Sequence, residues 1–139
     1  MRLEIFGVEG VPEIHPGDDL AGIIAGTAAL QGGDVVVVTQ KVVSKAENRL
    51  VRLDTTSKAA VIEAESVRVL RRRGEMVISE TRHGFVCANA GVDLSNVDDG
   101  WAALLPVDPD RSARRLRDGI RARAGVDVAV IISDTFGRP

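Results

Sequence analysis

GGDVVVVTQKVVSKAENR, residues 32–49, places two lysines directly after a short apolar run. The valines at 35–38 are continuous and β-branched, which predicts a strand covered on both faces. A helical pattern precedes this strand at residues 20–30, with Asp18 and Asp19 as candidate N-caps, and an alternating pattern at residues 2–8 predicts an earlier strand. The order strand, helix, strand indicates an α/β (mixed α+β) fold, a mixed sheet flanked by helices.

The rest of the chain continues to alternate between strand and helix patterns, with no repeat or linker. A third helix has Asp110 as its candidate cap and Gly125 at its end. Residues 89–100 are polar and rich in turn formers, which predicts a loop. The further predicted elements are strands at residues 50–53, 76–79, 85–88, 102–105 and 126–133 and a helix at residues 55–72.

Composition excludes several classes of protein. The chain has 139 residues, 45% of them hydrophobic, which suits one globular domain. A net charge of −2 argues against a nucleic-acid partner, and no apolar run approaches the length of a membrane span. Cys87 is the single cysteine, so it cannot form an internal disulfide. We expect a cytoplasmic protein in which Cys87 is a small buried hydrophobe.

Three polar groups follow predicted strands, where ligands gather in open α/β sheets. Lysines neutralise phosphates, and carboxylates beside a hydroxyl or amide provide oxygen ligands for Mg²⁺ or Mn²⁺. Together the groups predict a metal–nucleotide phosphate site without a P-loop motif. Each group alone has an ordinary structural alternative, because strand-end lysines are mostly solvated and loop aspartates mostly cap turns. The three groups are Lys41 with Lys45, Asp93 with Asn96, and Asp134 with Thr135.

Other charged clusters favour structural interpretations. The arginines of the third helix lie opposite its apolar positions, which is typical of a solvated face. Those at 71–73 would complement the dipole at the end of the second helix. His15 and His83 are too far apart in sequence for a zinc motif, although His83 remains a candidate wall of the site.

Four sequence blocks resemble the coenzyme F-420-0:L-glutamate ligase family. They are VVVVTQKVVSKAENR at 35–49, GFVCANAGVDLSNV at 84–97, LLPVDPDRSARRLR at 104–117 and VIISDTFGRP at 130–139. GVEGVPEI at 7–14 extends the similarity almost end to end.

The resemblance implies a GTP-dependent ligase that adds L-glutamate to coenzyme F-420-0 through γ-linked amide bonds and an acyl-phosphate intermediate. It also implies Mg²⁺ or Mn²⁺, with K⁺ as a further candidate ion, and a homodimer with an F-420 γ-glutamyl ligase-like fold. GTP, L-glutamate and F-420-0 would be its small-molecule ligands, and no catalytic side chain is assigned. By the same resemblance, the metal-binding residues are Asp93, Asp134 and Thr135, and the nucleotide-binding residues are Val11, Pro12, Glu13, Ile14, Gln40, Lys41, Lys45 and Asn96.

The sequence departs from the family pattern in two ways. Asn48 stands where family members often have glycine, and asparagine tolerates a left-handed turn better than other non-glycine residues. Family ligases are also longer, so we expect residues 1–139 to be the N-terminal portion of the ligase domain, with more protein following and, in the actinobacterial form, a nitroreductase-like domain. Two alternatives stay open: a related carboxylate–amine ligase with another acceptor such as a folate, and a non-catalytic nucleotide-binding or assembly module.

Overall fold

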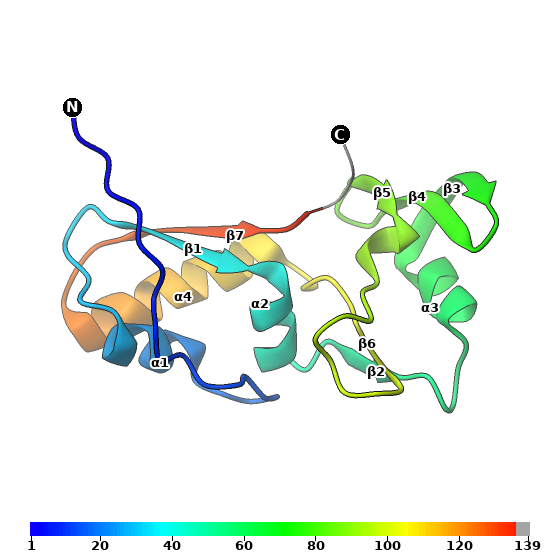
Figure 1. Ribbon diagram of the computed structural model, residues 1–139. Coiled ribbons are helices and arrows are strands. Elements are labelled where there is room, and N and C mark those ends of the chain that lie inside the picture. The colour runs from blue at the N-terminus through cyan, green and yellow to red at the C-terminus, as the bar shows by residue number, and fades with distance from the viewer. Residues whose placement is uncertain (136–139) are drawn as a thin grey trace.

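The computed structural model describes residues 1–135 and confirms an α/β fold (Figure 1). Its helices and strands alternate along most of the chain. In order they are α1 Leu20–Thr27, β1 Val35–Thr39, α2 Gln40–Ala46, β2 Leu50–Arg52, α3 Lys58–Glu65, β3 Ser66–Arg73, β4 Met76–Thr81, β5 Val86–Ala88, the 3-10 helix η1 Asn89–Gly91, β6 Trp101–Ala103, α4 Pro109–Ala124 and β7 Ala129–Ser133.

The described strands form three small sheets, so parallel and antiparallel pairing occur in different places. β1 and β7 pair in parallel, from Val35 opposite Ala129 to Thr39 opposite Ser133. β2 pairs antiparallel with β6, and β3, β4 and β5 form an antiparallel sheet at the other end of the molecule (Figure 1). The parallel pair is the part of this arrangement that positions the candidate site, as described below.

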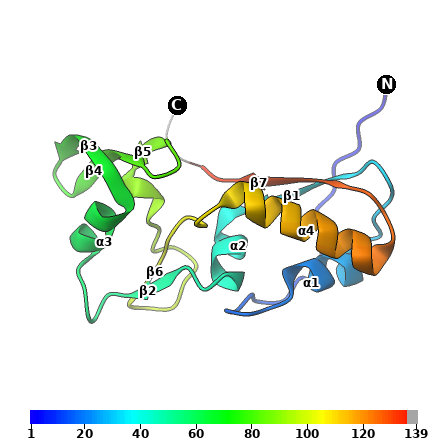
Figure 2. The same cartoon turned by 180° about the vertical axis from the view of Figure 1, so that it is seen from behind.

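α1 and α4 lie together on one face of the β1–β7 pair, as Figures 1 and 2 show from opposite sides. Val36 and Val38 of β1 are buried against Leu116 and Ile120 of α4. The arginines of α4 are exposed, as expected for a solvated face. Asp108, rather than the expected Asp110, caps this helix by accepting a hydrogen bond from the Arg111 N–H. No described helix combines the length and apolar character that crossing a membrane requires.

Two predicted elements are wrong. Residues 1–19 form no strand, because no described segment pairs with them. The predicted helix at 55–72 is replaced by α3 and then β3, which begins at Ser66. Val67 and Val69 alternate with Arg68, and this β-branched pattern favours the strand that pairs with β4. The arginines at 71–73 therefore lie on a strand and do not complement a helix dipole.

The chain passes from β1 directly into α2, so Lys41 and Lys45 lie on a helix. Asn48 follows α2 with a φ of 56°, which confirms that asparagine accommodates a left-handed turn there. The turn directs the chain into β2: Arg49 N–H donates to the Ser44 carbonyl at 2.7 Å, and Leu104 N–H donates to the Arg49 carbonyl at 2.9 Å.

We predict that Asn48→Ala lowers the free energy of unfolding by about 1 kcal/mol, because alanine is strained in the left-handed region. Asn48→Gly is the matched control and should be neutral or slightly stabilising, since glycine adopts this conformation without strain. Urea unfolding of the three proteins measures the difference. Equal stability of the alanine and glycine variants would contradict the assignment of this turn.

Candidate functional site

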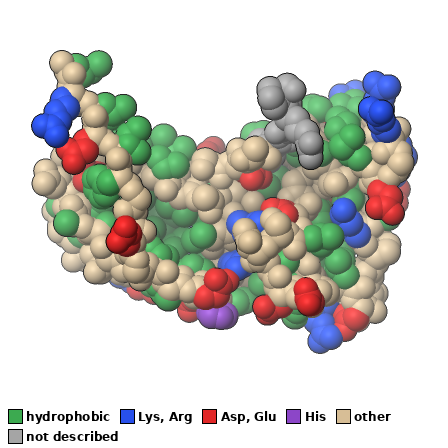
Figure 3. Space-filling view, in the orientation of Figure 1, with side chains coloured by type: hydrophobic (Ala, Val, Ile, Leu, Met, Phe, Trp, Pro, Cys, Tyr) green, Lys and Arg blue, Asp and Glu red, His purple; other side chains and the backbone are tan. Residues whose placement is uncertain are grey.

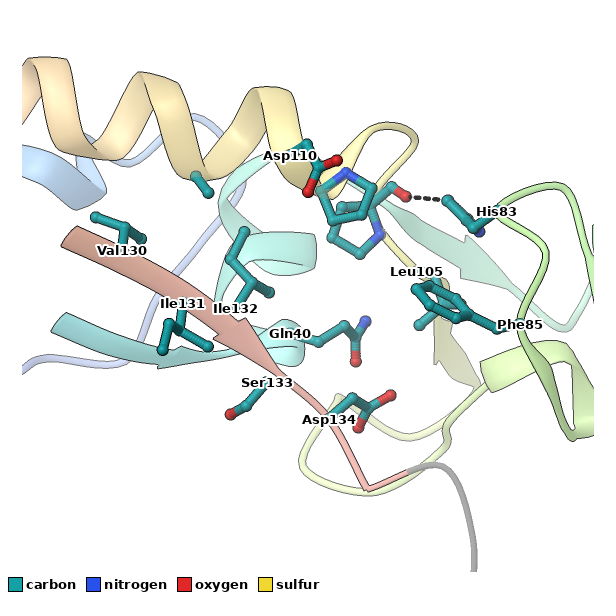
Figure 4. A pocket seen from close by; sticks show the side chains of 13 residues that line it. Gln40, His83, Phe85, Leu105, Asp110, Val130, Ile131, Ile132, Ser133 and Asp134 are labelled. Atoms are coloured by element: carbon teal, nitrogen blue, oxygen red, sulfur yellow. Dashed lines mark hydrogen bonds between the residues drawn. The ribbon is translucent and has the colours of Figure 1, made fainter. Parts of the chain in front are cut away.

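β1 and β7 end at the same edge of their sheet, because they are parallel and Thr39 pairs with Ser133. The next residue of each strand, Gln40 and Asp134, lines a pocket of about 310 Å³ at that edge. The turn between β4 and β5 and the first turn of α4 form the other walls (Figure 4). Two residues from sequence segments more than 90 positions apart therefore meet in one pocket.

Gln40 is held rigidly at the start of α2. It is 4% exposed, and its amide nitrogen donates to the Ser44 hydroxyl at 2.6 Å and to the Leu104 carbonyl at 3.1 Å. The Ser44 hydroxyl also donates to the Leu104 carbonyl at 2.6 Å. Because both polar side chains are buried and paired, this contact fixes the first turn of α2 against the segment after β6.

His83 forms part of the pocket wall. That His83 belongs to a ligand site stays a prediction. The Nε2 of His83 lies 2.7 Å from the Pro106 carbonyl oxygen. Because a carbonyl oxygen can only accept a hydrogen bond, the Nε2–H group is the donor. The imidazole also stacks on Phe85, with ring centroids 5.6 Å apart. His83 and Phe85 thus give the pocket an aromatic side opposite β7 (Figure 4).

Lys41 reaches from α2 to the loop after η1. Its Nζ lies 2.7 Å from the Asp93 carboxylate and 2.6 Å from the Ser95 hydroxyl. Burial raises the pKa of the Asp93 carboxyl, but the hydrogen bonds from Lys41 and from Ser95 outweigh burial, so the net pKa lies below its ordinary value. A predicted nucleotide-binding lysine and a predicted metal-binding aspartate are therefore direct partners.

Lys45 lies one helical turn further along α2 and pairs with Glu13. The hydrogen bond from Lys45, followed by its positive charge, lowers the pKa of the Glu13 carboxyl. Ile14, the next residue, is buried in the core beside α1 and β1, which anchors this segment. Two segments that the resemblance assigns to the nucleotide, residues 11–14 and α2, thus lie in contact.

A family model described as F420-0:Gamma-glutamyl ligase matches residues 10–139. The chain belongs to this family. It is 42% identical over 161 residues to the coenzyme F420:L-glutamate ligase of Methanothermobacter thermautotrophicus, covering 100% of this chain and 64% of the relative.

Two other ligase-family relatives show similar agreement. The chain is 45% identical over 157 residues to the coenzyme F420:L-glutamate ligase of Methanopyrus kandleri. It is 42% identical over 154 residues to the enzyme of the same name from Archaeoglobus fulgidus. Both matches cover 99% of this chain and 62% of the relative, so the chain spans less than two thirds of the length of these relatives.

The metal ligands that the ligase-family resemblance implies do not gather into a complete site within residues 1–135. No group of three or more His, Cys, Asp or Glu side chains in that range could hold a metal ion. Asp93 is already paired with Lys41, and Asp134 lies in the pocket, where its carboxylate accepts a hydrogen bond from the Thr135 N–H at 2.7 Å. The oxygen donors suit Mg²⁺ or Mn²⁺ chemically, but these residues alone do not supply the coordination.

The remaining predicted residues of the ligase-family site lie near these contacts. Val11 and Pro12 are exposed beside Glu13. Asn96 is exposed in the loop after Asp93 and has a φ of 53°. The final four residues of the last family block lie outside the described range.

Sequence reasoning missed two polar residues of this site. Ser44 is fully buried one helical turn after Gln40, and the i, i+4 spacing of these two polar residues was the available signal. Ser95 binds Lys41, and only its position next to the Asp93 segment pointed to it. Cys87, by contrast, is buried as expected, and burial raises the pKa of its thiol.

We predict that the Lys41–Asp93 pair stabilises the fold at neutral pH and loses this effect in acid. The pKa of Asp93 is lowered by folding, so its contribution is present above the ordinary aspartate pKa of 3.8 and is lost as pH falls through the folded value. The stability difference between the wild type and Asp93→Asn should be constant near neutrality and shrink below pH 3.8.

Urea unfolding at a series of pH values measures this difference. Asp110→Asn is the control, because Asp110 forms no ion pair within the described residues. A stability difference for Asp93→Asn that grows as the solution is acidified would contradict the pairing.

Proposed function

We propose that this protein contributes to a GTP-dependent ligase that joins L-glutamate to coenzyme F-420-0 through a γ-linked amide bond. The observation that supports this best is the meeting of three family segments at α2, where Lys45 pairs with Glu13 and Lys41 pairs with Asp93. Membership of the F420-0:γ-glutamyl ligase family and the names of its relatives support the substrates. The proposal includes the homodimer that the resemblance implies.

The chemistry needs activation of a carboxylate, because a carboxylate is a poor acylating agent. The substrate carboxylate oxygen attacks the γ-phosphorus of GTP, GDP leaves, and an acyl phosphate forms. The glutamate amine then attacks the acyl carbon, the C–N bond forms, and inorganic phosphate leaves as the amine loses a proton. Positioning and neutralisation of charge are the main requirements of phosphoryl transfer, so a protein nucleophile is not needed.

Lys41 and Lys45 are the groups that would neutralise the triphosphate. Both are cationic, and their side chains are only 16% and 13% exposed, so a bound phosphate would be partly shielded from water. The phosphates of bound GTP would replace Asp93 as the partner of Lys41 and Glu13 as the partner of Lys45. When bound, Mg²⁺ or Mn²⁺ would supply further positive charge to the phosphates.

A second candidate is a nucleotide-binding module without ligase activity. The observation that favours it is that the chain spans only 62–64% of the length of the relatives described above. A protein of this kind would bind GTP through the same lysines and would form no amide bond. A ligase with another acceptor, such as a folate, would form the bond but prefer the other substrate.

We predict that Lys45→Met weakens GTP binding about tenfold or more, because a charge-assisted hydrogen bond to phosphate contributes ~1.5–3 kcal/mol. Lys58→Met is the matched control, since Lys58 begins α3 away from the family segments. Its affinity for GTP should stay within about twofold of the wild type. Calorimetric titration of GTP in the presence of Mn²⁺ measures all three.

The calorimetry and an assay of glutamate ligation have three outcomes that bear on these candidates. Equal effects of the two lysine substitutions would contradict a nucleotide site on α2. Normal GTP binding without glutamate ligation to F-420-0 or to folates would favour the binding module, and ligation to folates in preference to F-420-0 would favour the other acceptor.

A further inference from the structure

Among residues 1–135, nothing covers one face of the β1–β7 sheet, and this face is apolar. α1 and α4 cover the opposite face, and burial along β1 alternates accordingly. Val35 and Val37 of β1 are 55% and 61% exposed, and Ile131, which pairs with Val37, is 51% exposed. Thr39, Ala129 and Ser133 complete this uncovered face, which carries no charge.

An uncovered parallel sheet is unusual. Parallel strands occur almost only in sheets that are covered on both faces, and their continuous apolar sequences reflect this. The four valines at 35–38 have that sequence pattern, yet only Val36 and Val38 are buried. The expectation that both faces are covered is therefore wrong for residues 1–135, and the uncovered face is a candidate interface.

The N-terminal segment independently indicates a partner. Residues 2–8 have a strand pattern but pair with no described strand, and Leu3 and Ile5 remain exposed. Figures 1 and 2 show this segment on the side of the sheet opposite α4. Figure 3 shows hydrophobic side chains along it and in the hollow beside it. An unpaired strand pattern and an uncovered sheet face thus lie on the same side of the molecule.

We propose that the uncovered β1–β7 face binds the portion of a ligase-family polypeptide that lies outside the region matched by this chain. More than a third of the length of each relative described above lies outside the match, which is enough polypeptide to form another layer on the sheet. The partner surface is uncharged and mostly apolar, since the face offers valine, isoleucine and alanine side chains with a threonine and a serine at one end. This inference concerns assembly and does not depend on the proposed reaction.

The test uses the 139-residue chain and, as the probe, the unmatched portion of the Methanothermobacter thermautotrophicus relative produced as a separate polypeptide. Co-expression followed by analytical ultracentrifugation should show a one-to-one complex, and hydrogen exchange should slow at the amides of β1 and β7. Val37→Lys should weaken this complex about tenfold or more, because it places a charge in an apolar interface. The matched control is Val107→Lys, a similarly exposed valine in a loop, which should change the affinity less than about twofold.

Three outcomes would overturn the proposal. One is the absence of a complex when both polypeptides are folded by circular dichroism. Another is a complex that Val37→Lys and Val107→Lys leave equally strong. The third is a dimer of the 139-residue chain alone that Val37→Lys dissociates, because the face would then bind a second copy of this chain.

Discussion

The parallel pairing of β1 with β7 is the constraint on which the rest of the site depends. It brings the chain near residue 40 next to the chain near residue 134, and its register places Gln40 and Asp134 at one edge. Neither strand could hold this arrangement alone, because burial of Val36 and Val38 against α4 keeps β1 in place. Apolar packing on one face of the sheet therefore determines where the polar residues meet.

α2 begins at that edge and carries three of the polar side chains of the candidate site. Its first residue is fixed by Ser44 and the Leu104 carbonyl, and its two lysines extend to the Asp93 loop and to Glu13. The lysines are mostly shielded from water, so each requires a negative partner. Carboxylates fill that role here, and anionic phosphates are chemically suited to replace them. The two ion pairs of Lys41 and Lys45 thus hold three distant segments together. They also keep both ammonium groups where an anion could bind.

Much of the fold was predictable because local patterns were strong. The β-branched run of β1, the apolar seam of α4 and the left-handed turn at Asn48 all follow from local sequence. The wrong predictions depended on tertiary partners: residues 2–8 lack a pairing strand, and Ser66–Arg73 pairs with β4 instead of continuing α3. Strand-end reasoning selected Lys41 and Asp134 as candidates, but it could not show that Lys41 would pair with Asp93, since that contact depends on the reach of the side chain across the fold.

The central claim is that the segments around α2 form one anion-binding site. Amide chemical-shift mapping by NMR during titration with GTP and Mg²⁺ tests it most directly. The account predicts that the largest changes occur at Glu13, in α2, in the loop from Asp93 to Asn96 and at Asp134. Changes concentrated on β3 and β4, with none in α2, would contradict it.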